Sequence, residues 1–251
     1  MKNFFGSLLF ALSTLVSQAA TLTTSTLTGA DFPGWGPGTN EQRWFVSTTT
    51  GTAASVRDST QNGRGSIGAN SFFIRGADGG GYIDAFFKLG GGLNVGESVS
   101  FDFVYSWSDG TRGIEFISGT DKVSFTHSGS NALNFVNLVG TASAIYNEGF
   151  NSPFRITASA TGANQLTIET TNLQNSAFKD TQIVTMAVSG LNEIKFYTGG
   201  LGAGIAPADI DNFGLMMNNL SVIPEPSSSL LMGLGVAGLA VLRLRRVRKN
   251  G

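Results

Sequence analysis

The side chains that could carry out acid–base chemistry in this 251-residue chain are one histidine and a few carboxylates on expected strands. His127 is the only histidine. It shares the alternation of Val123 and Phe125 beside a turn, and the chain contains no Gly-x-Ser-x-Gly sequence. A structural histidine at a strand end is therefore favoured over the base of a serine hydrolase. One histidine also cannot supply a zinc site of the common multi-histidine type.

Glycoside hydrolysis needs only two carboxyl groups, so acidic residues on expected strands are candidates for it. They are Asp102, Glu115, Glu169 and Glu193. All four alternate with apolar residues, so in a simple sandwich they are expected to face solvent. A catalytic pair in a groove stays open as an alternative, because one outer face of a jelly roll can be a concave binding surface.

A cluster of oxygen side chains, Asp209, Asp211 and Asn212, follows the glycine-rich segment 199–204. Calcium prefers hard oxygen ligands supplied by flexible loops, so a structural calcium site is one interpretation. A loop whose Asp side chains cap backbone amides is the other. The spacing does not match an EF-hand, and no Gly-Lys-Ser/Thr sequence follows the glycines, so a phosphate-binding loop is not indicated.

The large amphipathic aromatic residues matter because sugars stack on exposed ring faces. They are Trp35, Trp44, Tyr82, Tyr105, Trp107 and Tyr197. Tyr105 and Trp107 fall on the apolar alternation of a strand, which favours core packing. Trp35 lies among glycines and prolines in residues 32–38, so it is expected on a loop and is the preferred candidate for glycan contact.

The tail has three parts in a fixed order. Pro224-Glu225-Pro226 forms a stiff, extended spacer, because proline fixes φ and removes amide donors. Residues 230–242 are apolar and uncharged, and the basic residues that follow are Arg243, Arg245, Arg246, Arg248 and Lys249. The apolar stretch is shorter than the roughly 20 residues that usually span a bilayer, but long basic side chains can snorkel and extend its reach. Basic residues behind such a helix indicate a cytoplasmic C-terminus.

This arrangement over residues 222–249 closely resembles the PEP-CTERM sorting signal of Gram-negative bacteria. The resemblance implies that an exosortase-type membrane enzyme recognises Pro-Glu-Pro and removes the tail. It also implies export to the cell surface or extracellular matrix, often in bacteria that make exopolysaccharide. It implies nothing about the activity of the body.

The front of the chain reads as a secretory signal peptide. One positive charge precedes an apolar stretch from Phe4 to Val16, and small residues follow it, so cleavage is expected after Ala19 by signal peptidase of the secretion machinery. The expected organisation is therefore a signal peptide at 1–19, a β-sandwich domain at 20–221 and a sorting tail at 222–251.

The charge and cysteine content of the body exclude several classes of function. Residues 21–223 contain ten Lys and Arg against sixteen Asp and Glu, a net charge of −6. A nucleic-acid-binding protein would show a basic stripe, and this sequence has none. The chain also has no cysteine, so disulfides, thiol catalysis and thiolate metal sites are absent, and burial must hold the fold together.

Alternating apolar and polar residues predict short strands separated by Gly, Asn and Asp turns. The strongest strand is 97–107, and residues 97–127 are expected to form a three-stranded meander. Hairpins are expected over 154–171 and 182–197. The last strand, 212–222, changes its apolar parity near Asn218-Asn219, which predicts a β-bulge there. Weaker strands are 44–46, 71–75 and 81–89.

Together these patterns predict an all-β, jelly-roll-like antiparallel sandwich of the lectin type. The expected function is that of an exported structural or adhesive protein with weak glycan binding, without catalytic activity and without a cofactor other than calcium. Extracellular polysaccharide is the expected partner. The alternative is a carbohydrate-active hydrolase or lyase on the same scaffold.

Overall fold

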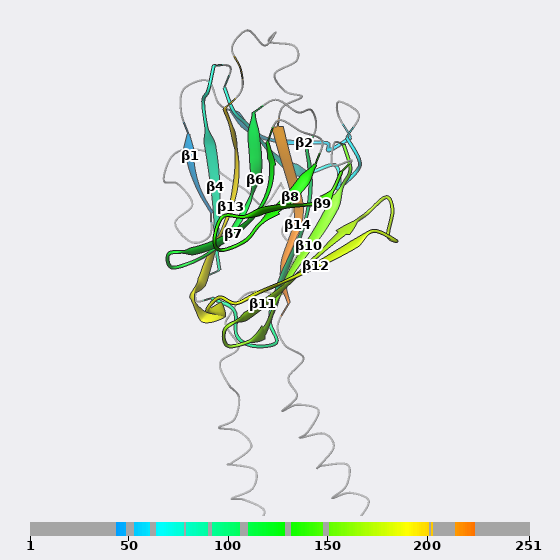
Figure 1. Cartoon of the computed structure of the whole chain (residues 1–251). Coiled ribbons are helices and arrows are strands. Elements are labelled where there is room, and N and C mark those ends of the chain that lie inside the picture. Colours follow the sequence, from blue (N-terminus) through cyan, green and yellow to red (C-terminus); the bar gives the residue numbers. More distant parts are fainter. Residues whose placement is uncertain are drawn as a thin grey trace, which may run out of the picture.

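The computed structural model describes residues 44–48, 53–60, 64–77, 79–89, 92–105, 110–128, 132–147, 151–200, 202 and 214–223. These residues form two seven-stranded antiparallel sheets packed face to face, together with the short 3-10 helix η3 (Val188–Gly190) (Figure 1). Sheet 1 has the order β1-β4-β13-β6-β7-β8-β9, and sheet 2 the order β12-β11-β10-β5-β14-β3-β2.

The strands of sheet 1, in chain order, are β1 (Trp44–Thr48), β4 (Ile83–Lys88), β6 (Thr111–Ser118), β7 (Asp121–Ser128), β8 (Leu133–Val136), β9 (Ala142–Tyr146) and β13 (Leu191–Gly199). The strands of sheet 2 are β2 (Ala53–Arg57), β3 (Ser71–Arg75), β5 (Ser98–Tyr105), β10 (Phe154–Gly162), β11 (Gln165–Asn172), β12 (Lys179–Val184) and β14 (Gly214–Ile223).

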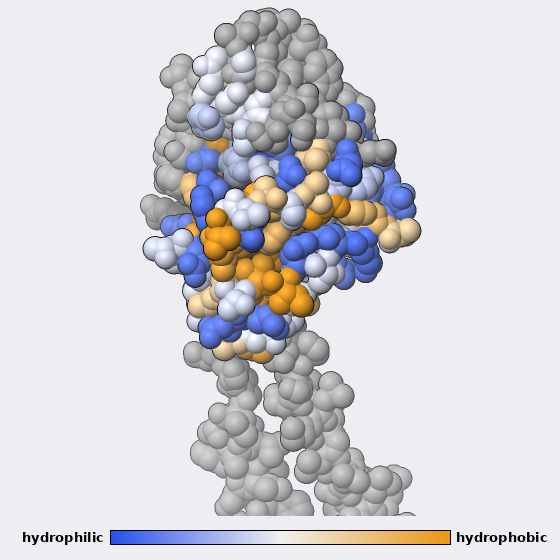
Figure 2. Space-filling view, in the orientation of Figure 1, coloured by the Kyte–Doolittle hydropathy of each residue, from blue (hydrophilic) through white to orange (hydrophobic). Residues whose placement is uncertain are grey.

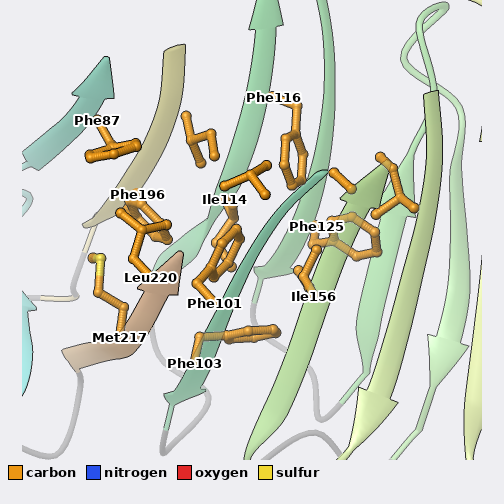
Figure 3. Close-up of a cluster of buried hydrophobic side chains, with 14 of the residues drawn as sticks. Phe87, Phe101, Phe103, Ile114, Phe116, Phe125, Ile156, Phe196, Met217 and Leu220 are labelled. Atoms are coloured by element: carbon orange, nitrogen blue, oxygen red, sulfur yellow. The ribbon is translucent and has the colours of Figure 1, made fainter. Parts of the chain in front are cut away.

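The core lies between the sheets and is built by alternation along the strands. On β10, Phe154, Ile156 and Ala158 are fully buried, whereas Arg155 between them is exposed. Figure 3 shows phenylalanine side chains of both sheets meeting in this layer, and the ring of Phe101 on β5 lies 5.1 Å from that of Phe196 on β13. Each such ring contributes about 1.5–3 kcal/mol when it leaves water. Burial of this kind holds a chain without cysteine together.

The meander expected over residues 97–127 is wrong in its first half. β5 pairs with β10 and β14 in sheet 2, whereas β6 pairs with β7 and β13 in sheet 1. The chain therefore crosses between sheets after β5. Alternation is the same for two strands that pair and for two strands that face each other across a core, so the pattern could not separate these cases. The β6–β7 hairpin itself is confirmed.

The hairpin expected over 182–197 is also wrong. β12 pairs with β11 in sheet 2, and β13 pairs with β4 and β6 in sheet 1. The Ser189-Gly190 turn belongs to η3, which carries the chain from one sheet to the other. A turn signal is local, and it does not specify which strand becomes the neighbour.

Other expectations of the sequence are confirmed. β10 and β11 form the hairpin predicted over 154–171, and the weaker strands appear as β1, β3 and β4. The register of β14 against β5 shifts between Asn218 and Ser221, with Asn219 at a φ of 53°, which is the predicted bulge. Strands β2, β8 and β9 were not predicted.

Candidate functional site

Most site residues named from the sequence lie outside the described residues. They are Trp35, Asp209, Asp211, Asn212, Pro224, Glu225, Pro226, Arg243, Arg245, Arg246, Arg248 and Lys249. Residues 1–19, the expected signal peptide, also lie outside them. Within the described ranges, no three His, Asp or Glu side chains cluster so that they could hold a metal ion. No helix in those same ranges is long and apolar enough to cross a bilayer.

His127 lies between the sheets rather than at the surface. Its side chain is 1% exposed, and its ring centroid lies 4.7 Å from that of Tyr105. Burial, and then the nearby charge of Arg112, lower the pKa of His127 to about 3, so the imidazole is neutral at neutral pH. A histidine in this position contributes to packing and cannot reach a substrate on the surface.

Asp102 was expected to face solvent, and this is wrong because it is only 2% exposed. Arg155 donates two hydrogen bonds to its carboxylate, from Nε at 2.7 Å and from Nη2 at 2.9 Å. Asn219 of the β14 bulge donates a third, from Nδ2 at 2.7 Å. The outer face of sheet 2 is covered at this point, where Asn218 donates to the carbonyl of Ile67 at 2.9 Å. Asp102 therefore holds the bulge in place.

Of the other acidic candidates, Glu169 lies in sheet 2, whereas Glu193 and Glu115 lie on neighbouring strands of sheet 1. Glu169 is partly exposed on β11 and binds Lys179 at 3.0 Å on the neighbouring strand of sheet 2. Glu193 lies on β13 and Glu115 on β6, both on the outer face of sheet 1. Of the four, only Glu115 lies among several charged and aromatic side chains.

Glu115 is the centre of a charge cluster on that outer face. Lys195 lies directly opposite it on β13 and approaches Oε2 to 2.7 Å, while Lys122 on β7 approaches Oε1 at 3.3 Å. The side chains of Glu115 and Lys195 are only 11% and 19% exposed, whereas that of Lys122 is 64% exposed. The two partly buried partners therefore form a preorganised ion pair, which loses little side-chain entropy when a ligand binds.

Two tyrosine rings lie on glycines of the neighbouring strand. Tyr197 on β13 covers Gly113 on β6, where a Cβ atom would meet the tyrosine hydroxyl at 2.7 Å. Its hydroxyl reaches one strand further and donates to Oγ1 of Thr126 at 3.1 Å. Tyr82, just before β4, covers Gly199 on β13 in the same way and is 53% exposed. Glycine at both positions leaves room for the rings to lie along the sheet.

Asp84 lies two residues after Tyr82 on β4, directly opposite Tyr197 on the adjacent strand. Burial raises the pKa of the Asp84 carboxyl. The charge of Lys195 opposes this rise and that of Glu115 adds to it. Burial likewise raises the pKa of Tyr197, although its hydrogen bond with Thr126 counteracts part of the effect. The Nζ atom of Lys195 lies 4.9 Å from the centre of the Tyr197 ring, so the two groups also form a cation–π contact.

We name this group the tyrosine patch; its members are Tyr82, Asp84, Glu115, Thr126, Lys195 and Tyr197. It combines ring faces with donors and acceptors, which is the composition of a site for a polyhydroxylated ligand. The sequence pointed to Glu115 and to the two tyrosines separately. It did not point to Asp84 or Lys195, because the β4-β13-β6 neighbourhood joins segments that are far apart in the chain.

The fold is similar to several solved structures at low sequence identity. One comes from work on endo-acting O-glycanases that prominent members of the human gut microbiota express to initiate mucin breakdown. It is 11% identical with a TM-score of 0.50, and the match covers 80% of this chain and 99% of that one. Peanut lectin is 8% identical with a TM-score of 0.42, covering 77% and 96%. The galectin LEC-6 of Caenorhabditis elegans is 12% identical with a TM-score of 0.38, covering 60% and 95%.

At such identities the likeness bears on the fold alone. The expected jelly-roll-like antiparallel sandwich is confirmed by the two sheets and by the match with a TM-score of 0.50. No curated protein matches the sequence.

The tail matches a family model described as the PEP-CTERM protein-sorting motif, over residues 222–246. The match confirms the resemblance seen in the sequence and covers the tail rather than the sandwich. Sorting of this kind implies an exported protein, a membrane-anchored precursor and processing by exosortase. The chain therefore carries a PEP-CTERM protein-sorting motif that begins in the last two residues of the final strand of an all-β sandwich.

Proposed function

We propose that the sandwich is a structural or adhesive module of the cell surface or extracellular matrix, and that it binds a glycan weakly through the tyrosine patch. The sorting motif supports the location. The observation that carries the binding role is the pair of tyrosine rings seated on Gly113 and Gly199, with Asp84 directly opposite Tyr197. A sugar ring presents apolar C–H faces to aromatic rings and hydroxyls to charged groups. The tyrosine rings and the charged side chains of the patch would therefore each contact a different part of the sugar.

Replacing Tyr82 with alanine tests this proposal, because Tyr82 is the most exposed ring of the patch and lies outside the core. We expect binding of extracellular polysaccharide to weaken about tenfold, equivalent to about 1.4 kcal/mol. Binding is measured by glycan array and affinity electrophoresis with purified residues 20–223, which contain every strand of both sheets.

The matched control is Ile183→Ala, which removes a 68% exposed side chain from β12 in the other sheet. This variant should bind like the parent protein. Equal binding by parent and Tyr82→Ala, or equal losses in both variants, would contradict a role for the patch.

A carbohydrate-active enzyme is the second candidate, and one observation favours it. Burial raises the pKa of the Asp84 carboxyl, and Glu115, two strands away on the same sheet, is held by two lysines. Two carboxyl groups on one face of a sheet, one of them with a raised pKa, are the kind of pair that glycoside hydrolysis uses. Polysaccharide turnover that is abolished by Glu115→Gln would establish this reaction, whereas binding without turnover supports the adhesive role.

A further inference from the structure

The last strand and the sorting motif overlap. The motif begins at residue 222, whereas β14 continues to Ile223. Val222 is 7% exposed and lies opposite Val99, and Ile223 pairs with Ser98. Pro224 therefore follows directly on a hydrogen-bonded strand, with no linker between the fold and the tripeptide.

Four turns close the sandwich at the end where β14 stops, and we name them the floor: residues 92–97, 118–121, 161–165 and 185–190. Figure 1 shows β14 ending at the same end of the sandwich as the β10–β11 turn. The turns bind one another through backbone groups. The amide of Val188 donates to the carbonyl of Ala163 at 3.2 Å, and that of Leu93 donates to Val188 at 3.1 Å. Ser118 Oγ donates to the carbonyl of Ala187 at 2.7 Å. The floor is therefore a single connected surface.

The floor carries almost no charge. Its four turns contain no Lys or Arg, and of their two acidic residues Glu97 is buried and accepts a hydrogen bond from the Asn94 amide at 2.8 Å. Only Asp121 is an exposed charge. Val95 and Ile223 are about half exposed, at 47% and 49%. Such a surface loses little hydration when another surface covers it.

The tail sets how far this surface can lie from the membrane. Residues 224–229 separate Ile223 from the apolar stretch that begins at Leu230. Six fully extended residues span about 20 Å, which is less than the roughly 30 Å diameter of a small domain. An enzyme that binds Pro224-Glu225-Pro226 in this space must therefore lie against the floor.

We propose that the floor is a docking surface for the membrane enzyme that processes the tail, so that the folded sandwich takes part in recognition together with Pro-Glu-Pro. This rests on the sorting role of the tail. The floor is uncharged and connected, and the tripeptide follows it without a flexible linker. Because the tripeptide is already held next to the docking surface, the enzyme loses less entropy when it binds both.

Pulse–chase conversion of the full-length precursor, in a bacterium that makes exosortase, measures this docking. Ala163 is an exposed residue of the floor, and we expect both Ala163→Glu and Ala163→Arg to slow conversion at least fivefold. Matched controls are Ala144→Glu and Ala144→Arg on β9, an exposed alanine of an edge strand, which should be processed at the parent rate. Unchanged thermal unfolding of the Ala163 variants shows that the fold is intact.

A further variant carries six additional Gly and Ser residues between Ile223 and Pro224. Docking predicts slower conversion, because the insertion separates the floor from the tripeptide. Faster conversion would show that the fold obstructs the enzyme, and normal rates in both Ala163 variants would show that the floor is not touched. Slowing by Glu with acceleration by Arg would indicate anionic lipid instead. Each of these three results overturns the proposal.

The sorting role is tested separately, by replacing Pro224-Glu225-Pro226. Normal processing of that variant would disprove the sorting role itself, whatever the Ala163 variants do.

Discussion

Replacing Pro224, Glu225 and Pro226 with alanine is expected to leave the tail on the protein. Proline restricts the backbone and disfavours a helix, whereas alanine is the residue most compatible with one. The change therefore removes both the side chains of the motif and the restriction that the two prolines place on the backbone. We expect processing to fall at least a hundredfold, so that cells accumulate a longer, membrane-held product. Immunoblots of membrane and medium fractions measure this.

The control keeps the backbone and changes the charge alone. Glu225→Gln retains both prolines, so it separates the contribution of the carboxylate from that of the stiff spacer. If the triple alanine variant is shortened and released like the parent, the tripeptide does not direct sorting, and the interpretation of the tail is wrong. The family match over residues 222–246 makes the opposite result the expected one.

Lowering the pH from 7 to 5 is expected to destabilise the sandwich through His127. Burial, and then the charge of Arg112, lower its pKa from 6.5 to about 3 in the folded protein. The unfolded chain therefore binds a proton that the folded chain excludes. The stability that the neutral His127 side chain contributes to the fold is fully present above pH 6.5. It is lost progressively as the pH falls toward 3. We expect a loss of about 1–2 kcal/mol in the free energy of unfolding between pH 7 and 5, the lower figure allowing for screening.

The measurement is urea unfolding at pH 7 and pH 5, for the parent and for His127→Leu. Leucine fills a similar space next to Tyr105 and cannot take up a proton. The variant should lose about 1–2 kcal/mol less than the parent over this interval. Equal losses in the two proteins would mean that other groups cause the acid sensitivity. Hydrogen bonds from Thr60 lower the pKa of Asp58, so protonation of Asp58 also destabilises the folded protein. That effect sets in only at lower pH than the effect of His127.

Figure 2 shows hydrophobic residues gathered on the surface over β8 and β9 and toward β11. Two exposed apolar residues are Val139 in the β8–β9 turn of sheet 1 and Ile183 on β12 of sheet 2, at 84% and 68% exposure. β9 and β12 are edge strands of the two sheets. Edge strands can pair with other chains. The apolar residues near these two edges therefore differ from the polar tyrosine patch, which lies on the face of sheet 1.

Much of the local structure followed from alternation and turn residues. The inward residues of β5, β10 and β11, the β10–β11 hairpin and the bulge at Asn218-Asn219 were all predicted, because each depends on neighbours within about ten residues. The weak strands β8 and β9 were missed. β9 carries mostly exposed small residues, so it has no alternating pattern to reveal it.

The sequence alone determined that this protein is exported and that its fold is all-β. A tripeptide, an apolar stretch and a basic end form a linear signal, and alternation with turn residues is enough for an all-β sandwich, because both are read along the chain. Only the tertiary structure decided which sheet each strand joins, that Asp102 is buried in a structural network, and that Asp84, Lys195 and Tyr197 meet Glu115 and Tyr82. The reason is physical: strand pairing between distant segments is set by how two sheets share one core, and no local pattern records it.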